Sequence, residues 1–285
     1  MKSTDTSLPL TDFFSPMPRS LAHRGNSVDF PENTEASFRS ANEMGVDVIE
    51  TDVRLMKDGE VLISHDPDLK RCAGDERLIS SLTGDDLSSI DMGRLFTKDQ
   101  GRTFPHKDKG ITPLLLRDAL ALFPETRFNI DLKDPGSELA EQTARIIQGA
   151  SAEKRVCVGS FHHSSIKAFR RFLPETATSL SQKEMLMVIL FYRLGWSPAA
   201  VRRGRVRAVQ IPEYAGPYRL IRPGFIRWCG AHNLVLQVWT VNEKEKMQQL
   251  FSEGVEGIFS DIPGLLLEVC RDYSILAPPR QISPS

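Results

Sequence analysis

The sequence predicts a single α/β domain, a (β/α)8 TIM barrel with a small insertion after the second strand and its hairpin. Short β-branched segments alternate along the chain with longer helical ones, which is the pattern of a parallel sheet covered by helices. Barrels of this type often have about 250 residues, close to the 285 of this chain. The sequence has no glycine-rich nucleotide-binding motif, which would favour an open, doubly wound sheet.

Eight segments have the length and composition of buried strands. They are Ser20–Arg24, Val46–Leu55, Arg127–Lys133, Arg155–Phe161, Ala177–Leu180, Arg207–Ile211, Val235–Val241 and Gly257–Ser260. A further short strand, Glu60–His65, follows Asp58-Gly59, a dipeptide typical of a hairpin turn.

Helices are predicted between these strands. The first begins after Asn33-Thr34 and ends before Gly45, because capping residues bound an apolar i, i+3 pattern there. The others are Ser137–Gly149, Ser164–Leu173, Gln182–Tyr192, Pro223–Ala231, Glu243–Glu253 and Pro263–Asp272.

The region from 67 to 113 fits no single strand–helix unit, because it is polar and rich in glycine. We interpret it as an insertion. It follows strand ends, where barrels of this type build their active sites, so we expect it to flank the pocket. The barrel domain is predicted to span residues 20–273, preceded by an extension over 1–19 and followed by a proline-rich tail over 274–285.

The composition argues against several classes of function. The formal net charge is -1, so no basic field favours nucleic acid. The four cysteines form no C-x-x-C pair and are typical of reduced thiols. No apolar run reaches the length of a membrane span, and the N-terminus lacks the apolar core of a signal peptide. We therefore expect a soluble cytoplasmic protein without a nucleic-acid partner; its oligomeric state stays open.

Carboxylates gather at the expected ends of two strands. Glu50 and Asp52 alternate along the second strand and so point to one face, and Asp131 lies near the end of the third. Buried neighbouring carboxylates repel each other unless a cation binds between them. Oxygen ligands without cysteine favour Mg²⁺ or Ca²⁺ over zinc. The pattern predicts one divalent-cation site at this end of the barrel.

Two histidines accompany these carboxylates, in His23-Arg24 after the first strand and in His65-Asp66 after the hairpin. Imidazoles can transfer protons and a guanidinium can hold phosphate oxygens, so this set indicates metal-assisted chemistry on a phosphate ester. Each feature alone has a plainer interpretation, such as a structural histidine, a solvated strand edge or an Arg24–Glu32 ion pair. Their concurrence at one predicted rim favours a shared site.

These motifs resemble those of the glycerophosphodiester phosphodiesterase family. The resemblance rests on His23-Arg24-Gly25, Pro31–Thr34, Glu50–Val53, Asp58-Gly59, His65-Asp66, Asn129–Lys133, Val238–Asn242 and Gly257–Pro263. It extends over Leu21–Leu267, nearly the whole predicted barrel. The family consists of metal-dependent TIM barrels, which agrees with the strand pattern.

Taken position by position, the resemblance implies roles for nine residues. They are His23 and His65 as general acid and base, Glu50, Asp52 and Asp131 as metal ligands, Arg24 and Lys133 on the phosphate, Trp239 as a pocket wall and Glu32 as a substrate or loop contact. Asp131 departs from many relatives, which have the longer glutamate there, so the metal preference or the coordination can differ.

The resemblance implies hydrolysis of a small-molecule glycerophosphodiester to glycerol 3-phosphate and an alcohol. It leaves open which histidine is the acid, and whether water or a substrate hydroxyl attacks phosphorus. One alternative is phospholipase D-like or lysophospholipase D-like cleavage of lipid phosphodiesters. The other is a barrel that binds a phosphodiester or a partner without catalysis.

Residues 185–196, MLMVILFYRLGW, are strongly apolar. The plainer interpretation is a barrel helix buried by its neighbours or a dimer contact. The other interpretation is peripheral lipid contact near the pocket mouth. A basic run within residues 202–207 is predicted to be a solvated loop.

Overall fold

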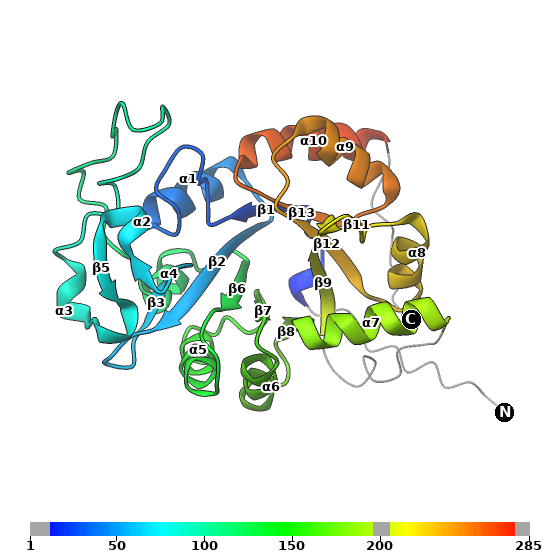
Figure 1. Ribbon diagram of the computed structural model, residues 1–285, viewed down its shortest axis with the longest axis horizontal. Helices are drawn as coiled ribbons and strands as arrows, with labels where there is room; N and C mark the ends of the chain where they lie inside the picture. The colour runs from blue at the N-terminus through cyan, green and yellow to red at the C-terminus, as the bar shows by residue number, and fades with distance from the viewer. Residues whose placement is uncertain (1–11, 196–205, 277–285) are drawn as a thin grey trace.

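A computed structural model describes residues 12–195 and 206–276 of the chain as a closed parallel barrel (Figure 1). Its eight strands are β1 (Ser20–His23), β2 (Val48–Leu55), β6 (Phe128–Leu132), β7 (Val156–Gly159), β8 (Ala177–Ser179), β9 (Val206–Pro212), β12 (Val235–Trp239) and β13 (Gly257–Ser260). They pair in this order, and β1 closes the barrel by pairing with both β2 and β13. The predicted fold class and all eight predicted strands are confirmed.

Helices connect the strands on the outside of the barrel. They are α1 (Glu35–Met44), α4 (Leu116–Leu122), α5 (Glu138–Gly149), α6 (His163–Phe172), α7 (Gln182–Leu194), α8 (Pro223–Ala231), α9 (Lys244–Glu253) and α10 (Pro263–Leu276). The sequence prediction contained all of these except α4. That helix has only seven residues and directly follows the insertion, so its apolar pattern is too short to stand out.

The loop before α1 has the capping chemistry that its sequence predicts. The Thr34 hydroxyl accepts a hydrogen bond from the Ser37 backbone N–H, and the Ser37 hydroxyl accepts one from the backbone N–H of Thr34. Gly45 ends the helix in the left-handed conformation, with φ of 84°. These caps fix the entry to α1, which follows the loop that carries Arg24 and Glu32.

The interior of the barrel changes from apolar to polar along its axis. At the amino-terminal ends of the strands, Phe13 and Phe14 pack in one cluster with residues such as Leu21, Val48 and Val235. They belong to the short helix η1 (Asp12–Phe14) and are almost fully buried. The described part of the predicted N-terminal extension thus completes the barrel core; residues 1–11 lie outside the described residues.

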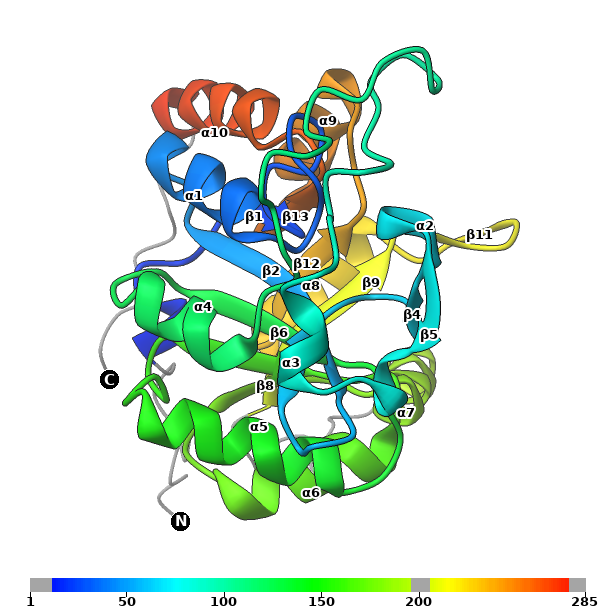
Figure 2. The same cartoon turned by 90° about the vertical axis from the view of Figure 1, so that its left-hand side faces the viewer.

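The insertion lies at the opposite, carboxyl end of the strands (Figure 2). The insertion is preceded by a hairpin strand, β3 (Val61–Ile63), which pairs antiparallel with β2. The insertion contains β4 (Asp68–Leu69), α2 (Lys70–Ala73), β5 (Asp75–Leu78), η2 (Ile79–Ser81) and α3 (Gly84–Leu87). Its apolar side chains, among them Leu69, Ile79 and Leu87, form a separate small core. A second short hairpin, β10 (Tyr214–Ala215) and β11 (Tyr218–Arg219), projects at the same end.

Three expectations bear on other parts of the chain. Within the described residues no helix is both long and apolar enough to cross a membrane. All four cysteines are free thiols, as expected. Arg202, Arg203 and Arg205 of the basic run, and residues 277–285 of the predicted tail, lie outside the described residues.

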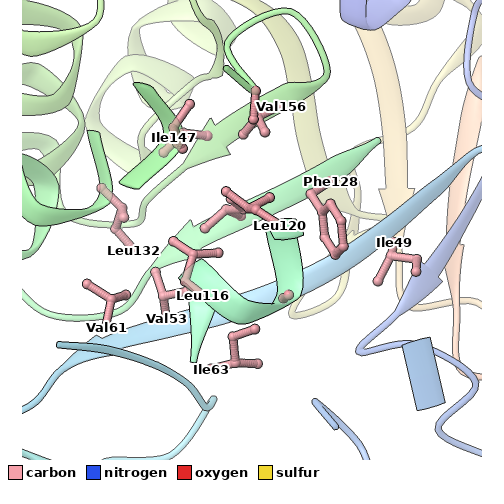
Figure 3. Packing of buried hydrophobic residues seen from close by; sticks show 14 of the residues in the cluster. Ile49, Val53, Val61, Ile63, Leu116, Leu120, Phe128, Leu132, Ile147 and Val156 are labelled. Atoms are coloured by element: carbon pink, nitrogen blue, oxygen red, sulfur yellow. The ribbon is translucent and has the colours of Figure 1, made fainter. Parts of the chain in front are cut away.

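The main core lies between β2, β6 and the helices that cover them, and Phe128 is one of its members (Figure 3). Its ring is fully buried and lies 5.8 Å from the Phe38 ring and 6.4 Å from the Phe123 ring, measured between centroids. We predict that Phe128→Ala lowers the free energy of unfolding by about 3–5 kcal/mol, measured by urea denaturation. Phe172→Ala, at a position 44% exposed, is the matched control and should change it by less than about 1 kcal/mol.

Candidate active site

The strand registers bring the three predicted metal ligands together at the carboxyl end of the barrel. Asp52 of β2 lies opposite Asp131 of β6, and Glu50 lies opposite His23 of β1. Glu50 and Asp52 share a face of β2 because they are two residues apart. Only 6% of Glu50 and 1% of Asp52 is exposed, so their charges lie in a poorly solvated place.

Two cations stand among these carboxylates. The Lys133 Nζ lies 2.8 Å from Asp52 Oδ1 and 2.7 Å from Asp131 Oδ2. The Arg24 Nε lies 3.3 Å from Asp52 Oδ2, and its backbone N–H donates to Glu50 Oε2 over 3.1 Å. The five residues form one charged cluster, in which Glu50 and Asp52 are buried and the other three are partly buried. The sequence predicted that they would lie together at this rim.

His23 is held at the edge of the cluster by Asp261, which follows β13. The His23 Nδ1 lies 2.7 Å from Asp261 Oδ1, and its Nε2 lies 3.9 Å from Glu50 Oε2. Asp261 also accepts hydrogen bonds from Asn242 (2.7 Å) and Ser27 (3.3 Å). Although burial raises the pKa of Asp261, these partners lower it below its usual value, so it is ionised. An ionised carboxylate only accepts, so the proton of a neutral His23 lies on Nδ1 and leaves Nε2 as a base.

His65 has the same arrangement with a local partner. Its Nδ1 lies 2.7 Å from Asp66 Oδ1, and Asp66 Oδ2 accepts a hydrogen bond from Arg71 Nε over 2.7 Å. Burial raises the pKa of Asp131, and the nearby charges of Lys133 and His65 act against this rise. Both predicted acid/base residues therefore border the same carboxylates.

Arg71 of α2 connects the insertion to this site. Its guanidinium donates to both Glu32 carboxylate oxygens over 2.7 Å, besides its bond to Asp66. Glu32 also accepts from Arg24 Nη1 over 2.8 Å. Glu32 thus lies between two arginines, one from the loop after β1 and one from the insertion.

Aromatic side chains border the cluster on the side of β7 and β12. Trp239 ends β12, and its ring lies 6.0 Å from the Phe161 ring, edge to face. The Lys133 Nζ lies 5.9 Å above the Phe161 ring. Phe161 is half exposed. The predicted wall residue Trp239 is thus beside the cluster, together with a second ring that the sequence reasoning did not assign.

Comparisons with known proteins agree with this geometry. The profile of the glycerophosphoryl diester phosphodiesterase family matches residues 23–265. A glycerophosphodiester phosphodiesterase from Caldanaerobacter subterraneus subsp. tengcongensis is 30% identical over 259 residues, which is 88% of this chain and 97% of that protein. The chain belongs to the glycerophosphoryl diester phosphodiesterase family. The predictions of this family and of an enzyme of this class are therefore confirmed.

Solved structures share the fold. An Oleispira antarctica phosphodiesterase in complex with the product sn-glycerol-3-phosphate matches with a TM-score of 0.71 at 22% identity, covering 90% of this chain and 98% of that one. A glycerophosphodiester phosphodiesterase from Agrobacterium tumefaciens matches with a TM-score of 0.72 at 20% identity, covering 90% and 100%.

Two polar residues of this site, Asp261 and Arg71, were not predicted from the sequence. Asp261 belongs to a motif that carried the resemblance, but its contact with His23 depends on β13 lying next to β1. Arg71 had no signal, because a single arginine in a polar insertion is ordinary. A functional imidazole is usually held in one orientation by a hydrogen-bond partner, so the sequence could have suggested that each histidine has a carboxylate neighbour.

The carboxylates fit a hard divalent cation by their chemistry, although the side chains do not surround one point. Across residues 12–195 and 206–276, no three His, Cys, Asp or Glu side chains form a group that could hold a metal ion. Lys133 instead bridges Asp52 and Asp131. Burial and the neighbouring Asp52 nevertheless raise the pKa of Glu50 to about 7, so the two cations leave part of the negative charge uncompensated.

This imbalance predicts a pH-dependent stability in protein freed of divalent cations. The folded state binds the Glu50 proton more tightly than the unfolded chain, so stability is lost as the pH rises from 4.5 to about 7. Glu50→Gln cannot ionise. The variant should be more stable than the wild type by about 1–3 kcal/mol at about pH 8, and equal to it at about pH 5, in urea denaturation with a chelator.

Glu43→Gln, at an exposed position of α1, is the matched control and should change stability at neither pH. If Glu50→Gln is less stable than the wild type at about pH 8, the ionised Glu50 does not destabilise the folded state, and the proposed charge imbalance is contradicted.

Proposed function

We propose that this protein hydrolyses glycerophosphodiesters to glycerol 3-phosphate and an alcohol. The observation that carries the proposal is the pair of imidazoles, each held at Nδ1 by a carboxylate over 2.7 Å, beside one cluster of three carboxylates and two cations. The Caldanaerobacter relative is named for this activity, and the Oleispira structure contains the product glycerol 3-phosphate.

Arg24 and Lys133 are suited to the phosphate group. Both are partly buried cations whose pKa lies above the usual value, because the carboxylates around them outweigh the cost of burial. They stay protonated at any physiological pH. Charge builds on the non-bridging oxygens as phosphorus is attacked, and fixed cations in a poorly solvated site stabilise that charge strongly. Trp239 packs against the part of the substrate that leaves.

The histidines move the protons. One imidazole takes the proton of the attacking oxygen, and the other donates a proton to the oxygen of the leaving alcohol. Asp261 and Asp66 orient the two rings and stabilise their protonated forms. Two imidazoles at one site can therefore serve attack and departure without an external acid or base.

Glu50, Asp52 and Asp131 would hold one divalent cation, Mg²⁺ or Ca²⁺, since carboxylate oxygens are the ligands these ions prefer. When bound, the cation neutralises phosphate charge and the repulsion among the three carboxylates. Lys133 would then contact the phosphate as well as the carboxylates, which its position between Asp52 and Asp131 allows.

His23→Ala and His65→Ala are each expected to lower kcat by about 10²–10⁴, because each removes one proton transfer. Release of choline from glycerophosphocholine measures this loss. His232→Ala, at the C-terminal end of α8, is the matched control and should keep nearly full turnover. Losses below about tenfold in both site variants would exclude the proposed acid/base pair.

Removal of divalent cations is expected to abolish turnover, and added Mg²⁺ or Ca²⁺ should restore it. Asp131→Asn should need at least about ten times more metal for half-maximal activity, because the affinity for a hard cation falls with the number of charged ligands. Isothermal titration with the metal alone measures the same weakening without activity. Asp118→Asn, half exposed on α4, should leave both readings unchanged. Full turnover in protein shown by elemental analysis to be metal-free would refute the metal requirement.

A further inference from the structure

The helix α7 presents an apolar face to solvent. Leu186, Met187, Leu190 and Leu194 are between 45% and 64% exposed. They are spaced so that they lie on one side of the helix. Scattered exposed leucines are ordinary on proteins, but four on one face of one helix make a continuous apolar patch. The plainer expectation of a helix buried by its neighbours holds only for the opposite face.

That opposite face explains why the helix forms and stays in place. Met185 and Val188 are buried against α8 and the strands behind it, in the cluster that includes Phe225. The Tyr192 ring lies 5.2 Å from the Phe225 ring. Ser181 caps the N-terminus, where its side chain accepts from the Glu184 backbone N–H. The outer leucines are therefore not needed for the barrel core.

The charges of α7 suit an anionic surface. Its one acidic residue, Glu184, is held inward by Arg170, with oxygen–nitrogen distances of 2.6 and 3.2 Å. Lys183 and Arg193 are exposed near its two ends. The sequence then continues from Met185 to Pro212 without any aspartate or glutamate. An apolar face flanked by cations is the pattern of helices that lie in the interface of anionic membranes.

The orientation of α7 also suits contact with a membrane surface. Figure 1 shows α5 and α6 nearly end-on and α7 along its length, and Figure 2 shows the reverse. α7 therefore runs across the barrel rather than along it, on the side where α2, β5 and the β10–β11 hairpin project. That hairpin carries the exposed Tyr214 and Tyr218. α7 and these projecting segments thus lie on the same side of the molecule.

We propose that the outer face of α7 docks on the surface of an anionic phospholipid bilayer. A second copy of the chain fits this face less well. Two such faces in contact would bring Lys183 and Arg193 of both copies together, and α7 has no outward carboxylate to pair with them. Bilayer headgroups supply the opposite charge, and acyl chains accept the leucines. Docking needs no catalysis, so its failure and the failure of the proposed hydrolysis are separate outcomes.

Flotation of the full chain with vesicles tests this proposal. One set of vesicles contains equal parts of phosphatidylglycerol and phosphatidylcholine, and the other contains phosphatidylcholine alone. We expect the wild type to float with the anionic set, and less so as salt is added. The triple variant Leu186→Ser, Met187→Ser, Leu190→Ser should lose at least about tenfold in apparent affinity, because three apolar side chains no longer enter the interface.

A matched triple variant replaces Met44, Leu122 and Phe172 by serine, at positions 41–44% exposed on other helices. It should bind vesicles like the wild type, and both variants should keep the thermal unfolding transition of the wild type. Equal vesicle binding by both triple variants would overturn the proposal. A wild type that does not bind anionic vesicles would also overturn it. This includes the case in which sedimentation shows that the chain instead dimerises through Leu186, Met187 and Leu190.

Discussion

The active end of the barrel depends on the placement of three carboxylates where charge is costly. The registers of β1, β2 and β6 set Asp52 beside Asp131 and Glu50 beside His23, whatever surrounds them. Burial and the neighbouring Asp52 raise the pKa of Glu50 and Asp131, whereas Lys133 and Arg24 outweigh burial at Asp52 and lower its pKa. This unfavourable placement of charge persists because the packing of the rest of the barrel fixes the positions of the strands. The site is thus a charge imbalance held in place by the core, and this imbalance is the reason for proposing that a divalent cation binds there.

The two imidazoles that we propose as proton-transfer groups depend on two different parts of the fold. His23 meets Asp261 only because β13 closes the barrel against β1, so that residues 238 apart in sequence are in contact. His65 instead depends on the insertion, since Arg71 holds both Asp66 and Glu32. Glu32 in turn holds Arg24. The loop after β1, the hairpin and the insertion therefore form one polar network, and none of them orders its share of the site alone.

Sequence alone predicted the strands and the site positions for the same physical reason. Buried parallel strands are β-branched, and a charge such as Asp52 or Asp131 is tolerated there only near a strand end. It could not predict contacts that depend on closure, such as His23 with Asp261 or the burial of Phe13 and Phe14. Nor did it find α4, whose two turns gain their stability from packing Leu116 and Leu120 on β2 and β3 (Figure 3).

The exposed face of α7 lies on the side of the helix opposite to Met185 and Val188, which pack in the core. Side chains on that outer face can change without disturbing Phe128 or the aromatic residues at the amino-terminal end of the barrel. A leucine face there adds nothing to the core and exposes apolar surface to water. A lipid surface would remove that cost.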